Sequence, residues 1–552
     1  MKLACIAAAL TATFAPVRAI WPLPQSLTNG STALRLSYGF HIVADFPHAA
    51  SDVYDAIERT KTYLFTDNLE RLVVGRGSGD VSSFETSQYL NQLQLSLAPG
   101  SSVLSITEEA QKPLDDRDEA YNLTVPSDGS PATITATSTL GLFRGLTTFT
   151  QLWYTYDGTI YTLSTPLQIE DYPAYPYRGL LLDTARNYFP VSDILRTLDA
   201  AELVKINQFH WHVVDSQSFP LIIPGFEELA TYGAYSASMV YTPADVANII
   251  SYASARGIDV MVEIDTPGHT AVIADAHPDF VACNQATPWA SYANEPPAGQ
   301  LRFTNETVAQ WTASLFAEVA KMFPSSIIST GGDEINMPCY NDDYETQLDL
   351  NTTARTFNDA LANFTAATHD VIYAAGKTPA VWEEQILNYN LSLPTNTYVL
   401  VWISSDDVLA VAEKGYPIIH AASNYFYLDC GGGGWVGDYP AGNSWCDPFK
   451  TWQYSYSFDP IANLTAEQAK LVKGGQQNLW TEQSSPSNLD PVVWPRAASS
   501  AELFWSGPFG NVDLALPRLH EVSFRMQQRG IHAIPLQPLW CALRPYACDL
   551  TA

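Results

Sequence analysis

Basic residues are scarce in this chain of 552 residues. Lysine and arginine together number 28, against 58 aspartates and glutamates, which gives a formal net charge of −30. Nucleic acids and anionic membrane surfaces attract proteins through clustered positive charge, so this balance argues against either as a partner. An acidic chain is instead compatible with an exported protein.

Apolar runs long enough to cross a bilayer are also missing. Met1-Lys2 is followed by the apolar stretch Leu3 to Phe14, which is too short for a stop-transfer helix, and Val17-Arg18-Ala19 offers small residues where a signal peptidase cleaves. We therefore predict that residues 1–19 are a signal peptide. The mature protein is expected to be soluble, and to be secreted or held in the lumen of the secretory pathway.

Cysteine is rare, and no Cys-x-x-Cys spacing points to zinc. Cys5 lies in the predicted signal peptide, and the other six are Cys283, Cys339, Cys430, Cys446, Cys541 and Cys548. An even number predicts three disulfides; nearest-neighbour pairing would close loops of modest length, but six cysteines allow about 15 connectivities. Glycan acceptor tripeptides agree with export, at Asn29, Asn122, Asn305, Asn351, Asn363, Asn390 and Asn463.

Charged residues make up 16% of the chain and apolar residues 46%, a composition typical of globular proteins rather than disordered ones. Residues 20–170 contain alternating runs typical of strands and an apparent helix over 140–153, which predicts a smaller α+β domain. The proline-rich stretch 171–177 marks a boundary, because each proline restricts its predecessor to extended conformations. We assign residues 171–552 to a catalytic domain with its C-terminal segment.

A phosphate-binding glycine loop is absent after the first strand of this second unit, which argues against an open doubly wound sheet. Short apolar strands instead recur eight times, with helical segments between most of them. They cover residues 179–183, 206–212, 258–264, 326–330, 379–382, 398–402, 417–421 and 477–480. This pattern predicts an α/β fold, a closed (β/α)8 TIM barrel whose active site lies at the carboxyl ends of the strands.

Two adjacent carboxylates, Asp333 and Glu334, follow one of these strands and two glycines. Glycines let a substrate approach the backbone closely, and two like charges in a partly dry pocket raise one pKa, so that a carboxylic acid remains available as a proton donor. The alternative is a turn with a solvated acidic pair. Further polar and aromatic residues fall at or just past strand ends: Asp183, His210, His212, Asp215, Asp265, His269, Trp382, Trp402, Tyr427, Asp429, Trp480 and Glu482.

Four aromatic residues, Trp382, Trp402, Tyr427 and Trp480, end four different predicted strands. Flat rings around one pocket suit the apolar faces of a sugar, while carboxylates and Arg178 suit its hydroxyl groups. Any one tryptophan could instead cap the barrel core. Four of them interleaved with carboxylates favour a carbohydrate ligand.

Six motifs in order resemble those of the β-N-acetylhexosaminidases of glycoside hydrolase family 20, and the smaller N-terminal domain and the terminal cysteines resemble, more loosely, those of the fungal members. The motifs are Arg178-Gly179 with Leu182-Asp183-Thr184-Ala185-Arg186, Phe209-His210-Trp211-His212-Val213-Val214-Asp215, Val262 to Thr270, Gly331-Gly332-Asp333-Glu334, Tyr425 to Asp429, and Leu479-Trp480-Thr481-Glu482 with Trp494-Pro495-Arg496-Ala497. The resemblance covers roughly residues 171–506.

The resemblance implies a substrate-assisted mechanism. Glu334 would protonate the glycosidic oxygen and later activate water, while the 2-acetamido oxygen of the substrate attacks the anomeric carbon. Asp333 would hold the acetamido N–H and stabilise the oxazolinium, and Tyr427 would bind the acetamido oxygen. His269 and Asp215 resemble a relay behind the acid, although a buried network that only stabilises the barrel is the alternative role.

The resemblance also implies how the sugar is bound. Arg178, Asp429 and Glu482 would bind ring hydroxyls, and the three tryptophans would wall the acetamido group and the ring. Supporting roles are expected for Asp183, Asp265 and Arg496. Ser329 and Ser216 depart from the family, where many members have His and a second Asp, which puts fine tuning and subsite preference in doubt.

Two other functions remain open from the residues alone. His210-x-His212 with His269 and His420 could belong to a metal-dependent hydrolase in which zinc activates water, and the barrel could be an inactive glycan-binding protein. The hypothesis we carry forward is an exo-acting hydrolase of terminal β-linked N-acetylglucosamine, with N-acetylgalactosamine as a second candidate. It needs no cofactor or metal, acts on chitin oligosaccharides or N-glycan termini, and could form a homodimer as some relatives do.

Overall fold

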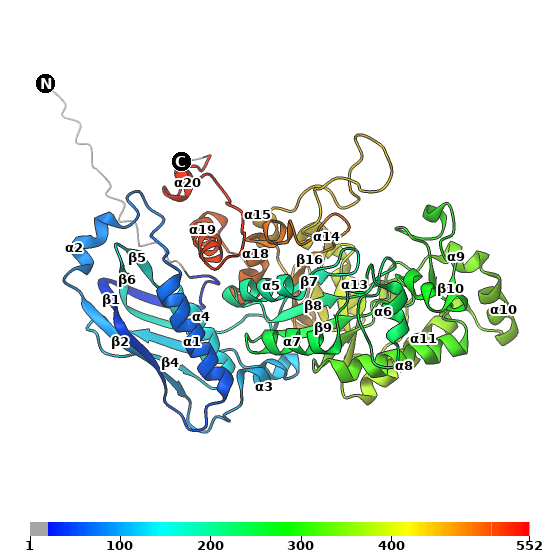
Figure 1. Ribbon diagram of the computed structural model, residues 1–552, viewed down its shortest axis with the longest axis horizontal. Helices are drawn as coiled ribbons and strands as arrows, with labels where there is room; N and C mark the ends of the chain where they lie inside the picture. The colour runs from blue at the N-terminus through cyan, green and yellow to red at the C-terminus, as the bar shows by residue number, and fades with distance from the viewer. Residues whose placement is uncertain (1–19, 509, 551–552) are drawn as a thin grey trace.

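The computed structural model describes residues 20–508 and 510–550. The predicted signal peptide lies outside these residues. The chain forms two units side by side, a sheet domain drawn at the left of Figure 1 and a barrel at the right. In the part of the chain that is described, every helix is too short or too polar to cross a bilayer.

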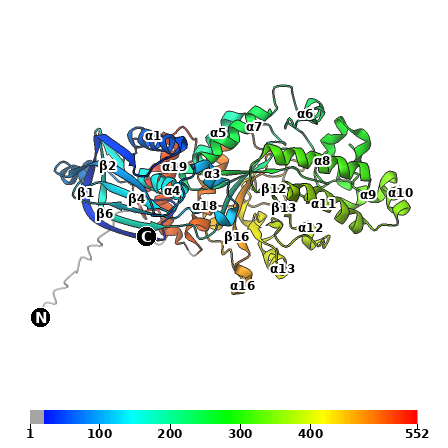
Figure 2. The same ribbon diagram turned by 90° about the horizontal axis from the view of Figure 1, so that it is seen from below.

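The N-terminal unit is a six-stranded mixed sheet with the order β1-β2-β4-β3-β6-β5. Helices α1 (Ser51–Thr66) and α4 (Thr139–Thr150) pack against each other and cover one face of it (Figures 1 and 2). The strands are β1 (Ser26–Ala44), β2 (Gln88–Leu97), β3 (Tyr121–Val125), β4 (Ala132–Ala136), β5 (Tyr154–Tyr156) and β6 (Thr159–Asp171). Alternate residues of the central strands, such as Leu93 and Leu95, are buried beneath α4, as the period of two requires. The predicted α+β character is confirmed.

The second unit is a closed, all-parallel eight-stranded barrel with the order β12-β13-β14-β15-β16-β7-β8-β9. Its strands are β7 (Tyr177–Asp183), β8 (Gln208–His212), β9 (Asp259–Glu263), β12 (Ile327–Ser329), β13 (Thr378–Trp382), β14 (Tyr398–Val401), β15 (Ile418–His420) and β16 (Val472–Leu479). All eight predicted strands coincide with one of these. The largest difference is β16, which begins five residues before the predicted start because Gly474 and Gly475 carry little strand propensity.

Helices surround this barrel and connect its strands. The longer ones are α5 (Val191–Leu203), α7 (Pro243–Ser254), α8 (Glu306–Met322), α11 (Phe357–Ala374) and α18 (Arg496–Ser506). Shorter ones, α12 (Glu384–Leu387), α13 (Val408–Glu413), α14 (Ser423–Phe426) and α15 (Trp452–Tyr456), follow the later strands. Buried leucine, isoleucine, valine and phenylalanine side chains of the helices and strands form one large core. The predicted TIM barrel is confirmed.

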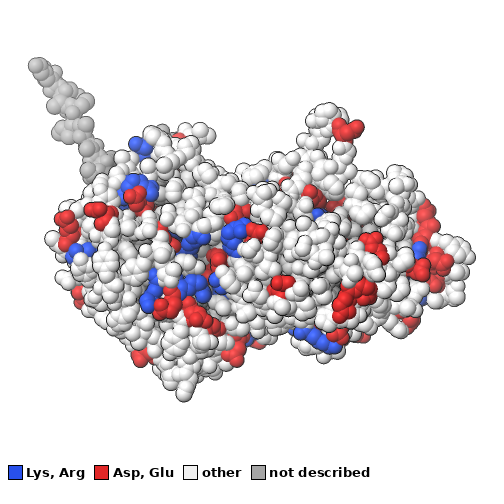
Figure 3. Space-filling view, in the orientation of Figure 1, with Lys and Arg blue, Asp and Glu red and all other residues white. Residues whose placement is uncertain are grey.

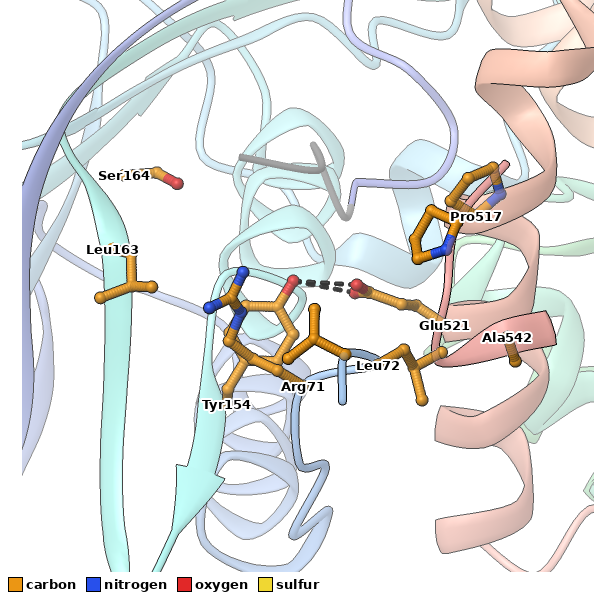
Figure 4. Close-up of a pocket in the computed structure, with 10 residues that line it drawn as sticks. Arg71, Leu72, Tyr154, Leu163, Ser164, Pro517, Glu521 and Ala542 are labelled. Carbon is orange, nitrogen blue, oxygen red and sulfur yellow. Dashed lines mark hydrogen bonds between the residues drawn. The ribbon is translucent and has the colours of Figure 1, made fainter. Parts of the chain in front are cut away.

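The C-terminal helix α19 (Val512–Gln528) lies between the barrel and the sheet domain, and α20 (Leu539–Ala542) lies above it in Figure 1. Arg529 forms an ion pair with Asp67 at 2.7 Å. Figure 4 shows the Tyr154 hydroxyl of β5 donating to Glu521 of α19, at 3.0 Å from each carboxylate oxygen, beside a cavity of about 30 Å³. Burial raises the pKa of Glu521 to about 7. Helix α19 therefore joins the barrel to the sheet domain through buried polar contacts.

Three disulfides join nearest neighbours along the chain: Cys283–Cys339, Cys430–Cys446 and Cys541–Cys548. The predicted number is confirmed, and the pairing is the one with the shortest loops. The second bridge closes the loop between α14 and α15, which projects above the barrel in Figure 1.

Candidate active site

A cavity of about 490 Å³ opens at the carboxyl ends of the barrel strands. Eight of the predicted site residues line it: His269, Asp333, Glu334, Trp402, Tyr427, Asp429, Trp480 and Glu482. They come from the segments that follow five different strands, so the closed barrel brings together residues that are far apart in the sequence.

The two glycines before the carboxylates are required by the backbone. Gly331 and Gly332 have φ values of +64° and +94°, and a Cβ atom on them would lie 2.1 Å from Asp265 Oδ1 and 2.4 Å from Gln385 Nε2. Gly332 N–H donates to Asp265 Oδ1 at 2.7 Å. Glu334 itself has a φ of +51°, an uncommon conformation for a residue other than glycine. The turn is thus held in a strained form that directs Asp333 and Glu334 into the cavity.

Asp333 has an unsatisfied oxygen facing this site. Its side chain is buried, and among the described residues no N–H or hydroxyl group donates to Oδ1. Burial raises the pKa of Asp333, although the His269 imidazolium opposes this shift. Burial and the charge of Asp333 also raise the pKa of Asp265 well above its usual range. A buried acceptor without a donor is costly, which indicates that a ligand N–H or O–H completes this group.

Glu334, His269 and Asp215 form a line leading away from the cavity. His269 Nε2 lies 3.3 Å from Glu334 Oε2, and His269 Nδ1 lies 3.1 Å from Asp215 Oδ1. Burial disfavours the imidazolium, but the adjacent Asp215 outweighs it and raises the pKa of His269 well above its usual range. Burial favours a neutral Glu334, but the hydrogen bond and charge of His269 lower the pKa of Glu334 below its usual value. In the free protein the proton of this pair therefore lies on His269.

The line continues into the barrel interior. Asp215 Oδ2 lies 2.6 Å from His212 Nε2, and His212 Nδ1 lies 2.6 Å from Glu263 Oε1. Burial opposes charge on His212, but the hydrogen bonds that it donates to the Asp215 and Glu263 carboxylates raise its pKa to about 10. His210 also binds Glu263, at 3.2 Å, and Ser329 donates to the same carboxylate. Ser329 thus occupies the barrel interior beneath the site.

His210 and His212 do not converge on a common metal position. Each points a ring nitrogen at Glu263, and neither belongs to any of the groups of three candidate ligands that the described residues form. His420 is buried on the other side and binds the carbonyl oxygen of Pro460 at 2.9 Å. His210, His212 and His420 are therefore already paired, whereas His269 belongs to two of these groups, with Asp215 and Glu295 and with Asp265 and Asp333.

Aromatic rings form one side of the cavity. Trp402 stacks on Tyr427 with 6.3 Å between ring centroids and 10° between planes, and Trp480 lies 6.2 Å from Tyr427. Burial raises the pKa of Tyr427 well above its usual value, so its hydroxyl stays protonated and can donate. Trp382 is 1% exposed and packs 6.1 Å behind Trp480. Its direct contact with a sugar stays a prediction.

Asp429 and Glu482 both line this cavity. Burial raises the pKa of Asp429 to about 7, and Asp429 Oδ1 accepts no hydrogen bond from the described residues. Burial likewise raises the pKa of Glu482 well above its usual range, although Arg186 opposes this shift. Both groups are thus positioned for hydrogen bonds with a bound molecule.

The prediction that Arg178 binds the substrate is wrong. Arg178 is at the amino-terminal start of β7, is fully buried, and donates to both oxygens of Glu119 in the sheet domain at 2.6 Å. A parallel strand separates its two ends by about 20 Å over seven residues, so Arg178 and the cavity lie at opposite ends of the barrel. Arg186, in the same motif but past the end of β7, lines the cavity instead.

Arg186 is the only lysine or arginine among the described residues that line the cavity. It pairs with Asp183 at 3.2 Å, Asp215 at 3.0 Å and Glu295 at 2.6 Å. Its guanidinium lies 5.1 Å from the centroid of the Trp480 ring. The signal that could have identified it is its position three residues beyond the strand end, where active-site residues of barrels are found.

The three residues expected to have supporting roles bind backbone groups around the site. Asp183 accepts from the N–H groups of Ala185 and Thr481 at 2.8 and 3.1 Å. Arg496 donates to the carbonyl oxygen of Leu428 at 2.6 Å, just before Asp429. Asp265 holds the glycine turn, as described above.

Several lining residues were not predicted. Trp435, Val436 and Trp445 come from the loop closed by Cys430–Cys446, and Trp445 packs edge-on against Trp402 with centroids 5.7 Å apart. Trp289, Asn294 and Glu295 come from the long connection after β9. These loops follow no periodic pattern, and the cysteines flanking Trp435 and Trp445 were the only available signal.

Comparison with known proteins agrees with this arrangement. Residues 175–508 match the family model described as glycosyl hydrolase family 20, catalytic domain, and residues 20–152 match the model described as beta-acetyl hexosaminidase like. The first model spans the whole barrel. The second covers most of the N-terminal sheet.

Individual relatives support the same assignment. The chain is 36% identical over 454 residues to a beta-hexosaminidase of Arthroderma benhamiae, covering 78% of this chain and 74% of that protein. It is 37% identical over 447 residues to the chitooligosaccharidolytic beta-N-acetylglucosaminidase of Ostrinia furnacalis, covering 77% and 74%.

Solved structures show the same architecture. The chitobiase of Flavobacterium johnsoniae superimposes with a TM-score of 0.73 at 26% identity, covering 93% of this chain and 73% of that one. The β-N-acetylhexosaminidase of Streptomyces coelicolor superimposes with a TM-score of 0.71 at 25% identity, covering 95% and 98%. With the family models and the relatives, these matches show that the chain is a glycoside hydrolase and belongs to glycoside hydrolase family 20.

Proposed function

We propose that this protein is an exo-acting β-N-acetylhexosaminidase that removes terminal β-linked N-acetylglucosamine with retention of configuration. The observation that carries the proposal is Asp333 Oδ1, a buried acceptor without a donor, next to Glu334 at the mouth of the aromatic cavity. An acetamido N–H supplies the missing donor, and the acetamido oxygen is then available to attack the anomeric carbon.

In the first step Glu334 donates a proton to the glycosidic oxygen as the bond from C1 to that oxygen breaks. The proton reaches Glu334 from His269, 3.3 Å away, and Asp215 stabilises the imidazolium beforehand. The acetamido oxygen forms a bond to C1, which gives an oxazolinium. The Asp333 carboxylate offsets its positive charge without reorganising, and the Tyr427 hydroxyl donates to the acetamido oxygen.

In the second step water replaces the acetamido oxygen at C1. Glu334, now ionised, takes a proton from the water as the new bond forms, and the acetamide is regenerated. Two displacements at C1 retain its configuration. Ordinary retaining and inverting enzymes place two carboxyl groups on either side of the sugar, and substrate-assisted enzymes are an exception to that arrangement. Adjacent residues suit the exception, because one serves the leaving group and the other serves the amide.

Binding of one terminal sugar follows from the shape and charge of the cavity. Trp402 and Trp480 offer flat apolar faces, with Trp382 behind Trp480. Arg186 takes the role that the resemblance assigned to Arg178, and with Asp429 and Glu482 it supplies hydrogen bonds to ring hydroxyls. The barrel closes the cavity below, so a polysaccharide can enter only by its end.

The substrate class we propose is chitin oligosaccharides, with N-glycan termini and N-acetylgalactosamine as further candidates. The name of the Ostrinia furnacalis relative specifies chitooligosaccharides. Trp445 is 67% exposed at the mouth, where its ring offers a surface to a second sugar. Three disulfides agree with an oxidising, exported location.

A series of aryl β-glycosides with increasingly fluorinated N-acetyl groups tests the mechanism. Fluorine withdraws electrons from the amide oxygen, so kcat is expected to fall with each fluorine if that oxygen is the nucleophile. Proton NMR of the first-formed product should show the β-anomer. A flat response to fluorination, or an α-anomer formed first, would contradict the proposal.

A further inference from the structure

The segment that follows β13 contacts two separate parts of the active site. Glu383 accepts from the N–H of Trp402 at 2.6 Å, and Gln385 Nε2 donates to the carbonyl oxygen of Gly332 at 2.6 Å. Between them, Glu384 Oε2 accepts from Trp402 Nε1 at 2.8 Å, and Glu384 Oε1 accepts from the N–H of Glu334 at 3.4 Å. Of these three side chains, Glu384 is the one bound to both the catalytic turn and the aromatic wall.

We infer that Glu384 is a positioning residue, which fixes the backbone of the catalytic acid relative to the ring of Trp402. The inference rests on the proposed role of Glu334. Glu334 has a φ of +51°, so its N–H is directed by a backbone conformation that needs support from its surroundings. One carboxylate that binds this N–H and the indole N–H sets the distance between the proton donor and the surface on which the sugar rests.

Glu384 is buried, which opposes a charged side chain at this position. The residue is 5% exposed, and each of its two oxygens accepts one N–H group. Such hydrogen bonds favour the ionised carboxylate, whereas burial and the charge of Asp333 raise the pKa of Glu384 to about 8. A carboxyl group kept at this position, where burial and a like charge oppose its ionisation, indicates a functional rather than a packing role.

The side chain of Trp402 shows how the positioning would reach the substrate. Its ring lines the cavity and stacks on Tyr427, the proposed partner of the acetamido oxygen. A rotation of Trp402 would therefore disturb both the sugar face and Tyr427. Its only hydrogen-bonded side-chain atom, Nε1, is bound to Glu384.

Glu384→Gln tests the inference, because the amide keeps the shape but presents an NH2 group to one of the two N–H donors. We expect kcat to fall by roughly 10- to 100-fold, the cost of leaving one buried N–H donor without its acceptor, and KM to rise. Trp402→Phe removes the indole donor and one of the two fused rings but keeps a flat ring, so KM should rise with little change in kcat. In the double variant the two increases in KM should not add, because both act on one contact.

Glu521→Gln is the matched control, since it makes the same change at a buried glutamate of α19, outside the cavity. It should leave kcat and KM unchanged.

Wild-type kinetics in folded Glu384→Gln would overturn the inference, as would additive effects on KM. If Glu384→Gln does not fold, Glu384→Asp decides: its shorter carboxylate reaches only one donor, so a lowered kcat supports the inference and wild-type kinetics overturn it. Glu334→Gln distinguishes failure of the positioning role of Glu384 from failure of the proposed function, because full activity in that variant would refute the proposed function itself.

Discussion

The two ends of the barrel bury charged groups in opposite ways. At the amino-terminal end Glu119 accepts from Arg178 at 2.6 Å and from Arg144 at 2.7 Å, and Lys205 pairs with Asp171 at 2.9 Å. At the carboxyl end one arginine and the two imidazolium groups of His212 and His269 face an excess of carboxyl groups, namely Asp215, Asp265, Glu295, Asp333, Glu334, Asp429 and Glu482. At the amino-terminal end the buried acidic groups are matched by basic groups, whereas at the carboxyl end acidic groups are in excess.

The pKa values follow this difference. Burial favours a neutral Glu119, but the two arginines outweigh it and lower its pKa to about 2. Burial without sufficient cations raises the pKa of Asp429 to about 7. Carboxyl groups of similar burial are therefore structural at one end and available for a ligand at the other. On the face drawn in Figure 3, basic groups lie beside acidic ones over the left half and the centre, whereas acidic groups predominate at the right.

Removing the acid at the carboxyl end should have the largest effect. Glu334→Gln keeps the shape of the side chain but cannot transfer a proton, so kcat should fall by roughly 10²- to 10⁴-fold. Steady-state kinetics with an aryl β-N-acetylglucosaminide measure this loss. Unfolding curves should match those of the wild type, and a loss of less than tenfold would place the proton donor elsewhere.

At the amino-terminal end the expected loss is in stability. Arg178→Met leaves Glu119 with one partner fewer in a buried site, which should lower the free energy of unfolding by about 3–5 kcal/mol. The KM of the folded fraction should stay unchanged, because Arg178 lies far from the cavity. Arg186→Met is the comparison, and it should raise KM. An increased KM in Arg178→Met would restore the prediction that the structure overturned.

Most of this architecture could be predicted from the sequence. The exception was the motif around β7, in which the wrong arginine was assigned to the active site. The eight strands were recognisable because each is a short apolar run followed by polar residues. Arg178 and Arg186 stand at opposite ends of one such strand, and a motif gives no direction until β7 is placed in the barrel. The sequence therefore indicated the right strand but assigned the wrong arginine to the site.

Residues from irregular segments could be predicted least. Glu383 and Glu384 follow β13 as Asp333 and Glu334 follow β12, so the same signal of adjacent carboxylates past a strand was present and could have been used. Trp435 and Trp445 carry no such signal, because only the Cys430–Cys446 bridge and the folding of the loop bring them to the cavity. Disulfide pairing also required the structure.

His269→Asn should lower the highest pH at which the enzyme is active. In the wild type the reactive proton is retained up to the raised pKa of His269, whereas the variant leaves only Glu334, which loses its proton at lower pH. The descending limb of kcat/KM should therefore move to lower pH, with a loss in rate of about 10- to 100-fold. An unchanged limb would show that His269 does not hold the proton.

The smallest effect is expected at the domain junction. The pKa of Glu521 is raised from 4.5 to about 7, so its contribution to stability is fully present below pH 4.5 and is lost as the pH rises through about 7. Glu521→Gln should reduce the difference in unfolding free energy between pH 5 and pH 8 by no more than about 3 kcal/mol. Chemical denaturation at both pH values measures it, and an unchanged difference would contradict the assignment.

The most direct test of substrate assistance compares two sugars that differ only at C2. An aryl β-N-acetylglucosaminide and the matching β-glucoside are given to the wild type, Asp333→Asn and Glu334→Gln. We predict that the wild type hydrolyses the first sugar far faster and that both variants largely lose this activity. Equal rates on the two sugars in the wild type would contradict the account.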